Sequence, residues 1–319
     1  MTQETPKELS KKGFLTEEQF RKIELITSGK ILSVFYELRS LLYLGVMLFT
    51  TGVGILIYQN IGEFGHILSI IVLCILTAVC FWYAFKNVAG YSNLPVKTPT
   101  PYFDYVVLLG SLLFISVQGY LQFQFGLLNE NLGLSTLITA LFFFYVAYRF
   151  DHLGVLSLAI TALASFWSIS ISPQKWYSGD FFSSANLQIT AIVFSVVLAA
   201  LAVVLDKRSI KAHFTFTYLN FCCLIFFAGT IAGLFMGPLG IYLLLIYGGC
   251  GLAWLAARQK QAFLFLLYAF LAAYIGTTYL LFVIILNEVV ELWFLYSIAS
   301  CGAFIYFIIQ YKNYFSRKE

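Results

Sequence analysis

Ten apolar stretches follow one another along this chain of 319 residues, and each is long enough to cross a membrane as a helix. A hydrocarbon core of about 30 Å requires about 20 predominantly apolar residues in an α-helix. The chain is 61% hydrophobic and only 11% charged, which is more apolar surface than a soluble core buries. The sequence therefore predicts an all-α, polytopic membrane helix bundle. The predicted spans are 41–61, 66–85, 102–122, 132–148, 154–171, 187–205, 214–235, 239–257, 262–286 and 292–311.

The basic residues alternate with these spans so that 18 of the 19 Lys and Arg side chains fall on one side of the membrane. Only Lys175 falls on the other side. Because short loops rich in Lys and Arg stay in the cytoplasm, we expect both termini there. Residues 41–311 would then form the transmembrane domain, and residues 312–319 would form a cytoplasmic tail.

The N-terminal segment, residues 1–40, is the part of the chain suited to water. Thr16 and Gln19 have the spacing of a capping box at the start of a helix, and Phe20 and Ile23 then share one face. We expect a short cytoplasmic amphipathic helix. It could lie on the inner leaflet, in contact with membrane lipids, or it could dock a protein partner.

The distribution of charge and the lack of known motifs count against several classes of function. No predicted span carries Lys, Arg, Asp or Glu near its middle, which counts against a pump driven by protons or sodium. No hydrolase motif and no clustered metal-ligand pattern occurs, so we expect no catalytic residue, no metal and no cofactor. The net charge of +4 divides between the two faces and no nucleic-acid-binding motif is present, so no nucleic acid is expected. The oligomeric state is left open.

Polar residues gather near the predicted outer face. Gln118 and Gln122 lie one turn apart in the third span, and Gln59, Asn60 and Glu63 follow the first span at a similar depth. They could line an outward-facing polar vestibule. Alternatively, they are polar helix ends wetted by lipid headgroups.

Asn220 is the amide placed most deeply within a predicted span. Such a residue in a membrane helix commonly makes an interhelical hydrogen bond. The alternative is a contact with a substrate.

The N-terminal third of the chain also shows a recognisable order of motifs. A short helix, 13–26, is followed by a first span containing Gly45, Gly52 and Gly54, with Asn60 near its end. Over about residues 13–125 the chain resembles the bacterial predicted membrane protein family of unknown function, domain of unknown function family 2157. Ile61 stands where that family usually has Trp. The resemblance implies a location in the bacterial cytoplasmic membrane and brings no reaction or substrate.

Two hypotheses about function follow from these observations. The first is a non-catalytic inner-membrane protein that serves assembly, scaffolding or sensing, based on the uncharged spans and the N-terminal helix. The second is a transporter or lipid-handling protein for a neutral or amphipathic substrate, based on the number of spans and the outer polar cluster.

Overall fold

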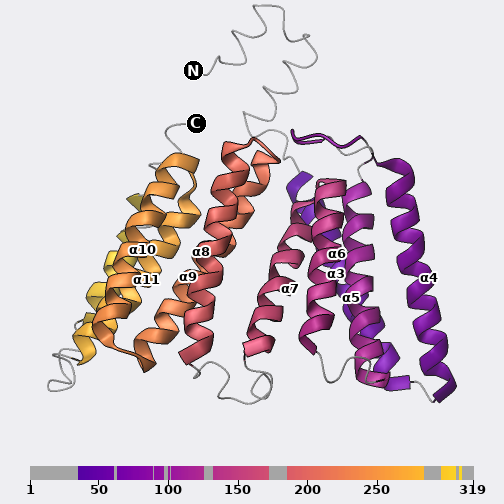
Figure 1. Ribbon diagram of the computed structural model, residues 1–319, viewed down its shortest axis with the longest axis horizontal. Coiled ribbons are helices and arrows are strands. Elements are labelled where there is room, and N and C mark those ends of the chain that lie inside the picture. The colour runs from indigo at the N-terminus through magenta and orange to yellow at the C-terminus, as the bar shows by residue number, and fades with distance from the viewer. Residues whose placement is uncertain are drawn as a thin grey trace, which may run out of the picture. The chain divides into compact units, whose positions relative to one another are not determined.

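The computed structural model describes residues 35–60, 63–88, 90–96, 100, 102–125, 132–171, 185–283, 296–306 and 309–310 (Figure 1). These residues are helical apart from short connections, and they contain no strand, which confirms the predicted all-α fold. Of the predicted N-terminal helical segment, residues 1–34 lie outside the described residues, as does the tail 312–319. The helices are α3 (Phe35–Asn60), α4 (Glu63–Asn87), α5 (Phe103–Phe125), α6 (Leu132–Phe150), α7 (Leu153–Ile171), α8 (Ala185–Lys207), η3 (Ala212–Phe214), α9 (Thr215–Met236), α10 (Leu239–Lys260) and α11 (Phe263–Leu281).

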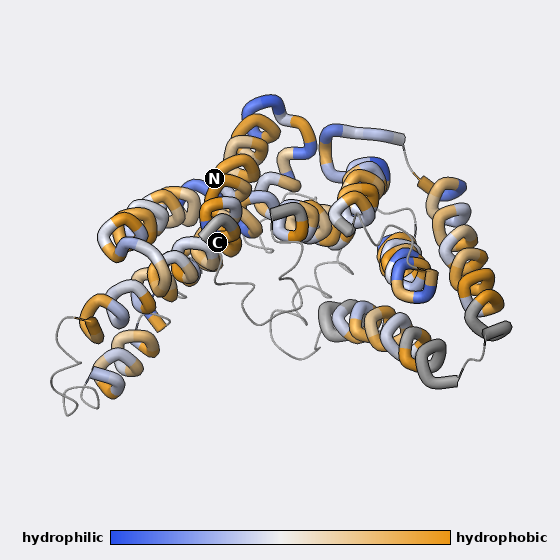
Figure 2. The backbone as a smooth tube through the Cα atoms, turned by 60° about the horizontal axis from the view of Figure 1, so that its bottom comes forward, coloured by the Kyte–Doolittle hydropathy of each residue, from blue (hydrophilic) through white to orange (hydrophobic). Residues whose placement is uncertain are grey.

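A helix occurs at each of the ten predicted spans. Within the described residues, seven helices are long and apolar enough to cross a membrane, and three shorter apolar helices cover 40–53, 153–169 and 296–306. Figure 2 shows that most of the helical tube is orange or white, whereas blue lies mainly at helix ends. Hydrocarbon offers no partner to a backbone N–H or C=O, and a helix satisfies these groups within its own segment.

The chain divides into two compact units, the first ending at Asn60 and the second beginning at Ile61. The first unit contains α3. The second unit contains α4 to α11, and it also contains every site described below.

Helix α9 is the packing centre of the second unit, because it contacts α7, α8, α10 and α11. One core cluster includes Phe143, Val146, Leu156 and Tyr218, none of which is more than 1% exposed. A second cluster lies between α9, α10 and α11 and includes Ile246. The apolar residues of α9 therefore serve two cores, one on each side of the helix.

Three helices end in the same backbone motif. Asp151, Ser209 and Gln261 adopt left-handed conformations, with φ of 58°, 52° and 50°. After each of them the next N–H donates to a carbonyl five residues earlier, at distances of 3.1 to 3.2 Å. This is the Schellman pattern, which satisfies a terminal helix carbonyl and turns the chain sharply. The connections α6–α7 and α10–α11 are only two residues long for this reason, whereas the α8–α9 connection continues through η3.

The turn after the C-terminal end of α9 depends on glycine. The ring of Tyr242, at the start of α10, lies against Gly233 and Gly237, where a Cβ atom would be 2.0 Å and 2.3 Å from ring carbons. By contrast, a Cβ at Gly240 would have no neighbour within 4 Å. Close packing of α9 on α10 therefore depends on the missing side chain at Gly233.

We expect Gly233→Ala to lower the free energy of unfolding by about 1–3 kcal/mol, because the ring of Tyr242 is wedged between two glycines and has no room to retreat. The matched change Gly240→Ala should leave stability unchanged or raise it by less than about 1 kcal/mol, as glycine replacement in a helix commonly does. Thermal unfolding of both variants in detergent checks the difference. Equal melting temperatures would contradict this account of the α9–α10 turn.

Candidate functional site

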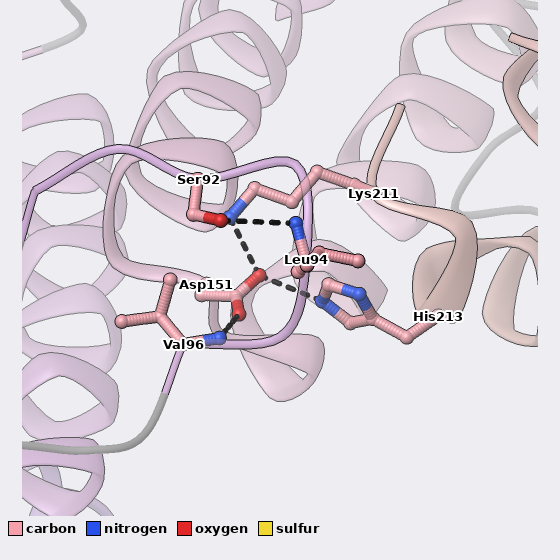
Figure 3. A network of polar contacts seen from close by, with 6 residues as sticks. All are labelled: Ser92, Leu94, Val96, Asp151, Lys211 and His213. Atoms are coloured by element: carbon pink, nitrogen blue, oxygen red, sulfur yellow. Dashed lines mark hydrogen bonds and ion pairs between the residues drawn. The ribbon is translucent and has the colours of Figure 1, made fainter. Parts of the chain in front are cut away.

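A buried polar cluster joins three connections at one end of the second unit. We call it the Asp151 cluster; it consists of Asp151, Lys211, His213 and the backbone N–H of Val96 (Figure 3). Asp151 lies in the turn between α6 and α7, whereas Lys211 and His213 flank the start of η3 between α8 and α9. Val96 belongs to the segment between α4 and α5. Three connections between consecutive helices thus depend on one carboxylate for part of their geometry.

The carboxylate of Asp151 accepts three hydrogen bonds. Lys211 Nζ donates to Oδ1 at 2.8 Å, and His213 Nε2 lies 2.7 Å from the same oxygen. The N–H of Val96 donates to Oδ2 at 2.7 Å. Because an ionised carboxylate only accepts hydrogen bonds, the proton of His213 must be on Nε2.

The cluster is almost closed to solvent. The side chains of Lys211 and Asp151 are 1% and 7% exposed, and that of His213 is 21% exposed. The ammonium of Lys211 also lies 5.2 Å from the centre of the Tyr91 ring and 5.8 Å from that of Phe214. Lys211 takes a left-handed backbone conformation, with φ of 49°, at the turn that carries it to the carboxylate.

The pKa of the Asp151 carboxyl reflects two opposing effects. Burial raises it, but hydrogen bonds from Lys211 and from the Val96 N–H lower it. The hydrogen bond and the charge of His213 lower it further, so the net pKa lies below the ordinary value of a carboxyl. Asp151 is therefore ionised at neutral pH and pairs with Lys211 as a buried ion pair.

His152, the residue after Asp151, fixes the start of α7. Its Nδ1 accepts a hydrogen bond of 3.1 Å from the N–H of Val155, as an N-cap side chain does. Nε2 therefore carries the proton and donates to the carbonyl of Asp104 at 2.9 Å. This buried histidine links the first turns of α5 and α7.

The arrangement suits a structural role better than catalysis. A histidine held by a carboxylate is a common acid–base pair, but here Lys211 neutralises the same carboxylate. The Nδ1 atom of His213 is buried and has no hydrogen-bond partner. In the described part of the chain, no group of three His, Cys, Asp or Glu side chains is placed to hold a metal ion.

Gln118, a predicted vestibule residue, is bound to a neighbouring helix. Its Nε2 donates to the carbonyl and the hydroxyl of Ser135 at 2.7 and 2.6 Å, and its Oε1 accepts a hydrogen bond from Thr139. It thus uses both ends of its amide to hold α5 against α6. Gln122 lies one turn later, and its Nε2 is buried with no hydrogen-bond partner.

The other predicted site residues are not brought together in this way. Gln59, Asn60 and Glu63 lie at the end of α3 and the start of α4, but their side chains are outside the described set. The polar vestibule therefore stays a prediction. Asn220 lies in α9 with its Oδ1 buried and without a hydrogen-bond partner, so its predicted interhelical bond also stays a prediction.

Sequence reasoning missed the Asp151 cluster, although the predicted spans put the loops that contain Asp151, Lys211 and His213 on the same face of the membrane. Opposite charges in short loops at one face were the available signal. The signal was weak because most such charges stay exposed: Lys260 Nζ and Asp206 Oδ1 are 2.9 Å apart, yet these side chains are 29% and 45% exposed.

We expect Asp151→Asn to lower the free energy of unfolding by about 3 kcal/mol, because it leaves the buried ammonium of Lys211 without its counter-charge. The matched control is Asp206→Asn, which breaks the exposed pair with Lys260 and should cost less than about 1 kcal/mol. Chemical unfolding in mixed micelles measures both changes. Similar losses in the two variants would show that burial does not set the strength of the Asp151 pair.

The lowered pKa of Asp151 also gives the sign of a pH dependence. A carboxyl with a lowered pKa stabilises the folded state above the unfolded pKa of about 4, and this stabilisation is lost as pH falls through the folded value. The stability gap between the unaltered protein and Asp151→Asn should therefore shrink as pH falls below about 4. A gap that stays constant in this range would argue against an ionised Asp151.

Comparison with known proteins gives one match. Residues 7–156 match the family DUF2157, described as predicted membrane protein. Searches of curated proteins and of solved structures find no match. The match confirms the resemblance predicted for residues 13–125 and extends it through α6 to the first turn of α7, so that Asp151 falls inside it and Lys211 outside. The chain is therefore a multi-pass membrane protein whose residues 7–156 are similar to DUF2157, a family of predicted membrane proteins.

Proposed function

We propose that this protein is a non-catalytic component of the bacterial inner membrane that serves assembly, scaffolding or sensing. The observation that carries the proposal is that several polar side chains within the described spans bond to neighbouring helices. Examples are Gln118 with Ser135, Tyr148 with Tyr218 at 3.1 Å, and Tyr247 with Thr277 at 3.0 Å. Side chains engaged in this way hold helices together and are not available to a substrate.

The charged groups support the same proposal. The Asp151 cluster neutralises itself and joins the connections at one end of the second unit. A carboxylate that already accepts from Lys211, His213 and Val96 has little capacity left for a passing ion. A rigid end of this kind fits a protein that presents a fixed surface.

The orientation in this proposal follows the positive-inside rule. The Asp151 cluster, Lys207 and Arg258 then face the cytoplasm, as do both termini. The N-terminal segment, residues 1–40, would then also be cytoplasmic and would provide the surface for a protein partner. Membrane lipids would contact the exposed apolar faces of the helices.

The partner surface can be tested with the apolar face of the N-terminal helix. We expect Phe20→Ser with Ile23→Ser to abolish complementation of a strain lacking the gene, while insertion and melting temperature stay unchanged. The matched control, Glu18→Ser with Lys22→Ser, alters the opposite face without changing net charge and should complement. Full complementation by the Phe20 and Ile23 variant, and by a deletion of residues 1–29, would remove the partner surface from the proposal.

The second candidate, a transporter or lipid-handling protein, is favoured by the buried Nε2 of Gln122, which lacks a hydrogen-bond partner one turn from Gln118. An amide of this kind could serve a substrate that enters from the outer face. Transport through a polar vestibule would then require both glutamines.

Leucine substitutions at the two positions distinguish the candidates. If both glutamines have only structural roles, the two substitutions should change stability in opposite directions. Gln118→Leu should lower the free energy of unfolding by about 1 kcal/mol, since it removes interhelical hydrogen bonds. Gln122→Leu should leave stability unchanged or raise it, since it removes a buried donor that lacks a partner. Both variants should complement the deletion strain. Loss of complementation by both, in protein that is folded and inserted, would favour the transporter over the scaffold.

A further inference from the structure

A cavity of about 270 Å³ lies between α8, α9 and α10. Its lining includes Val196 and Ala199 of α8, Cys222 of α9, and Leu252 and Ala253 of α10. No Lys, Arg, His, Asp or Glu lines it. The hydroxyl of Ser195, which also lines the cavity, donates to the carbonyl of Ile192 at 2.6 Å and is therefore satisfied within its own helix. The cavity thus offers shape and apolar surface, with no charge and no free hydroxyl.

Small residues on two helices create this space. Ala199 lies on the α8 wall, and Gly249, Ala253 and Ala256 lie on the α10 wall. A Cβ atom at Gly249 would come within 2.3 Å of the ring of Phe226, so the ring lies directly against the α10 backbone. Larger side chains at these positions would fill the gap between the helices.

The cavity opens toward the surface of the second unit. Val196 and Leu252 belong to its lining and are 58% and 70% exposed. Both residues lie near the middle of helices that are long and apolar enough to span a membrane. At that depth the surrounding solvent is lipid hydrocarbon. An empty apolar cavity forfeits dispersion contacts, and a lipid chain that enters it regains them.

Basic residues cluster at one end of the helices that form the cavity. Lys207 ends α8, Arg208 follows it, and both are exposed. Arg258, near the end of α10, is also exposed and stacks on Trp254 at 3.8 Å from the ring centre. The ion pair between Lys260 and Asp206 joins the same two helix ends. The opposite ends of these helices have no basic residue: there is none in the first turn of α8, in the first turn of α10, or at Gly237 and Pro238 between α9 and α10.

The spacing between cavity and cations matches one leaflet of a bilayer. Positions 196, 200, 203 and 207 share one stripe of α8, because they recur every three or four residues. At a rise of 1.5 Å per residue, the eleven steps from Val196 to Lys207 span about 16 Å. Half of a hydrocarbon core of about 30 Å is about 15 Å. A lipid with its headgroup beside Lys207 would reach Val196 with the far part of its acyl chain.

We propose that this cavity binds an acyl chain of an anionic phospholipid whose phosphate headgroup lies beside Lys207, Arg208 and Arg258. Lipid tails are as apolar as the cavity itself, so the shape of the tail decides how well it fills the cavity. The charge of the headgroup decides which lipid the site prefers. The site faces whichever leaflet contains these cations, so it requires neither the cytoplasmic orientation nor the scaffold role proposed above.

The test uses the full-length protein in nanodiscs of phosphatidylcholine that contain phosphatidylglycerol with a photoactivatable acyl chain. After illumination, mass spectrometry maps the crosslinks. We expect crosslinks to 195–199 and 249–256, with Val196→Phe losing them and Val197→Phe keeping them. Val197 is the matched control because it is 52% exposed on the same helix and does not line the cavity. Both changes lie at exposed positions and should preserve the fold, which melting temperatures check.

A second arm tests the headgroup. Phosphatidylcholine with the same photoactivatable chain should label the cavity more weakly than phosphatidylglycerol. Lys207→Gln should lower the phosphatidylglycerol labelling about fivefold, since one cation near a headgroup is worth about 1 kcal/mol. Lys86→Gln removes a cation at the end of α4 and should leave labelling unchanged. Equal labelling by the two lipids would overturn the proposal, as would equal labelling of Val196→Phe and Val197→Phe, or cavity crosslinks to a second copy of the chain instead of lipid.

Discussion

The need to satisfy every backbone N–H and C=O inside hydrocarbon governs this structure. Helices meet that need along the spans, but the last carbonyls of each helix still require partners. Three helices solve this with a left-handed residue and a hydrogen bond back over five residues, at Asp151, Ser209 and Gln261. The resulting turns are tight, and they bring polar side chains from different connections close together at one end of the unit.

The Asp151 cluster is a consequence of those turns. The α6–α7 turn presents Asp151, and the longer α8–α9 connection delivers Lys211 and His213 to it. Burying an ion pair costs desolvation free energy, which is offset only when the charges are paired and fully hydrogen-bonded. Here both carboxylate oxygens have partners. The cluster also bonds Asp151, inside the DUF2157 match, to residues beyond its end.

Within the spans, polar and small residues have complementary effects on packing. Gln118 bonds across α5 and α6, and Tyr148 bonds across α6 and α9, so these polar groups add directional contacts where lipid gives no hydrophobic drive. Glycine and alanine allow close approach, as Gly233 does beneath Tyr242. Where small residues of α8 and α10 line a space beside α9, they leave a cavity instead.

The sequence by itself determined the all-α membrane class and the position of each described spanning helix to within about six residues, because long uncharged apolar runs have no other stable conformation in lipid. It also placed charged residues at helix ends. Only the tertiary structure decided that Asp151 pairs with Lys211, while Asp206 stays exposed, since burial depends on which turns meet in space. The same holds for Gln118, whose partners Ser135 and Thr139 lie on another helix, and for the cavity, which requires three helices to be placed together. Hydropathy records how deep a residue lies in the membrane, whereas helix rotation and neighbour identity decide what it touches.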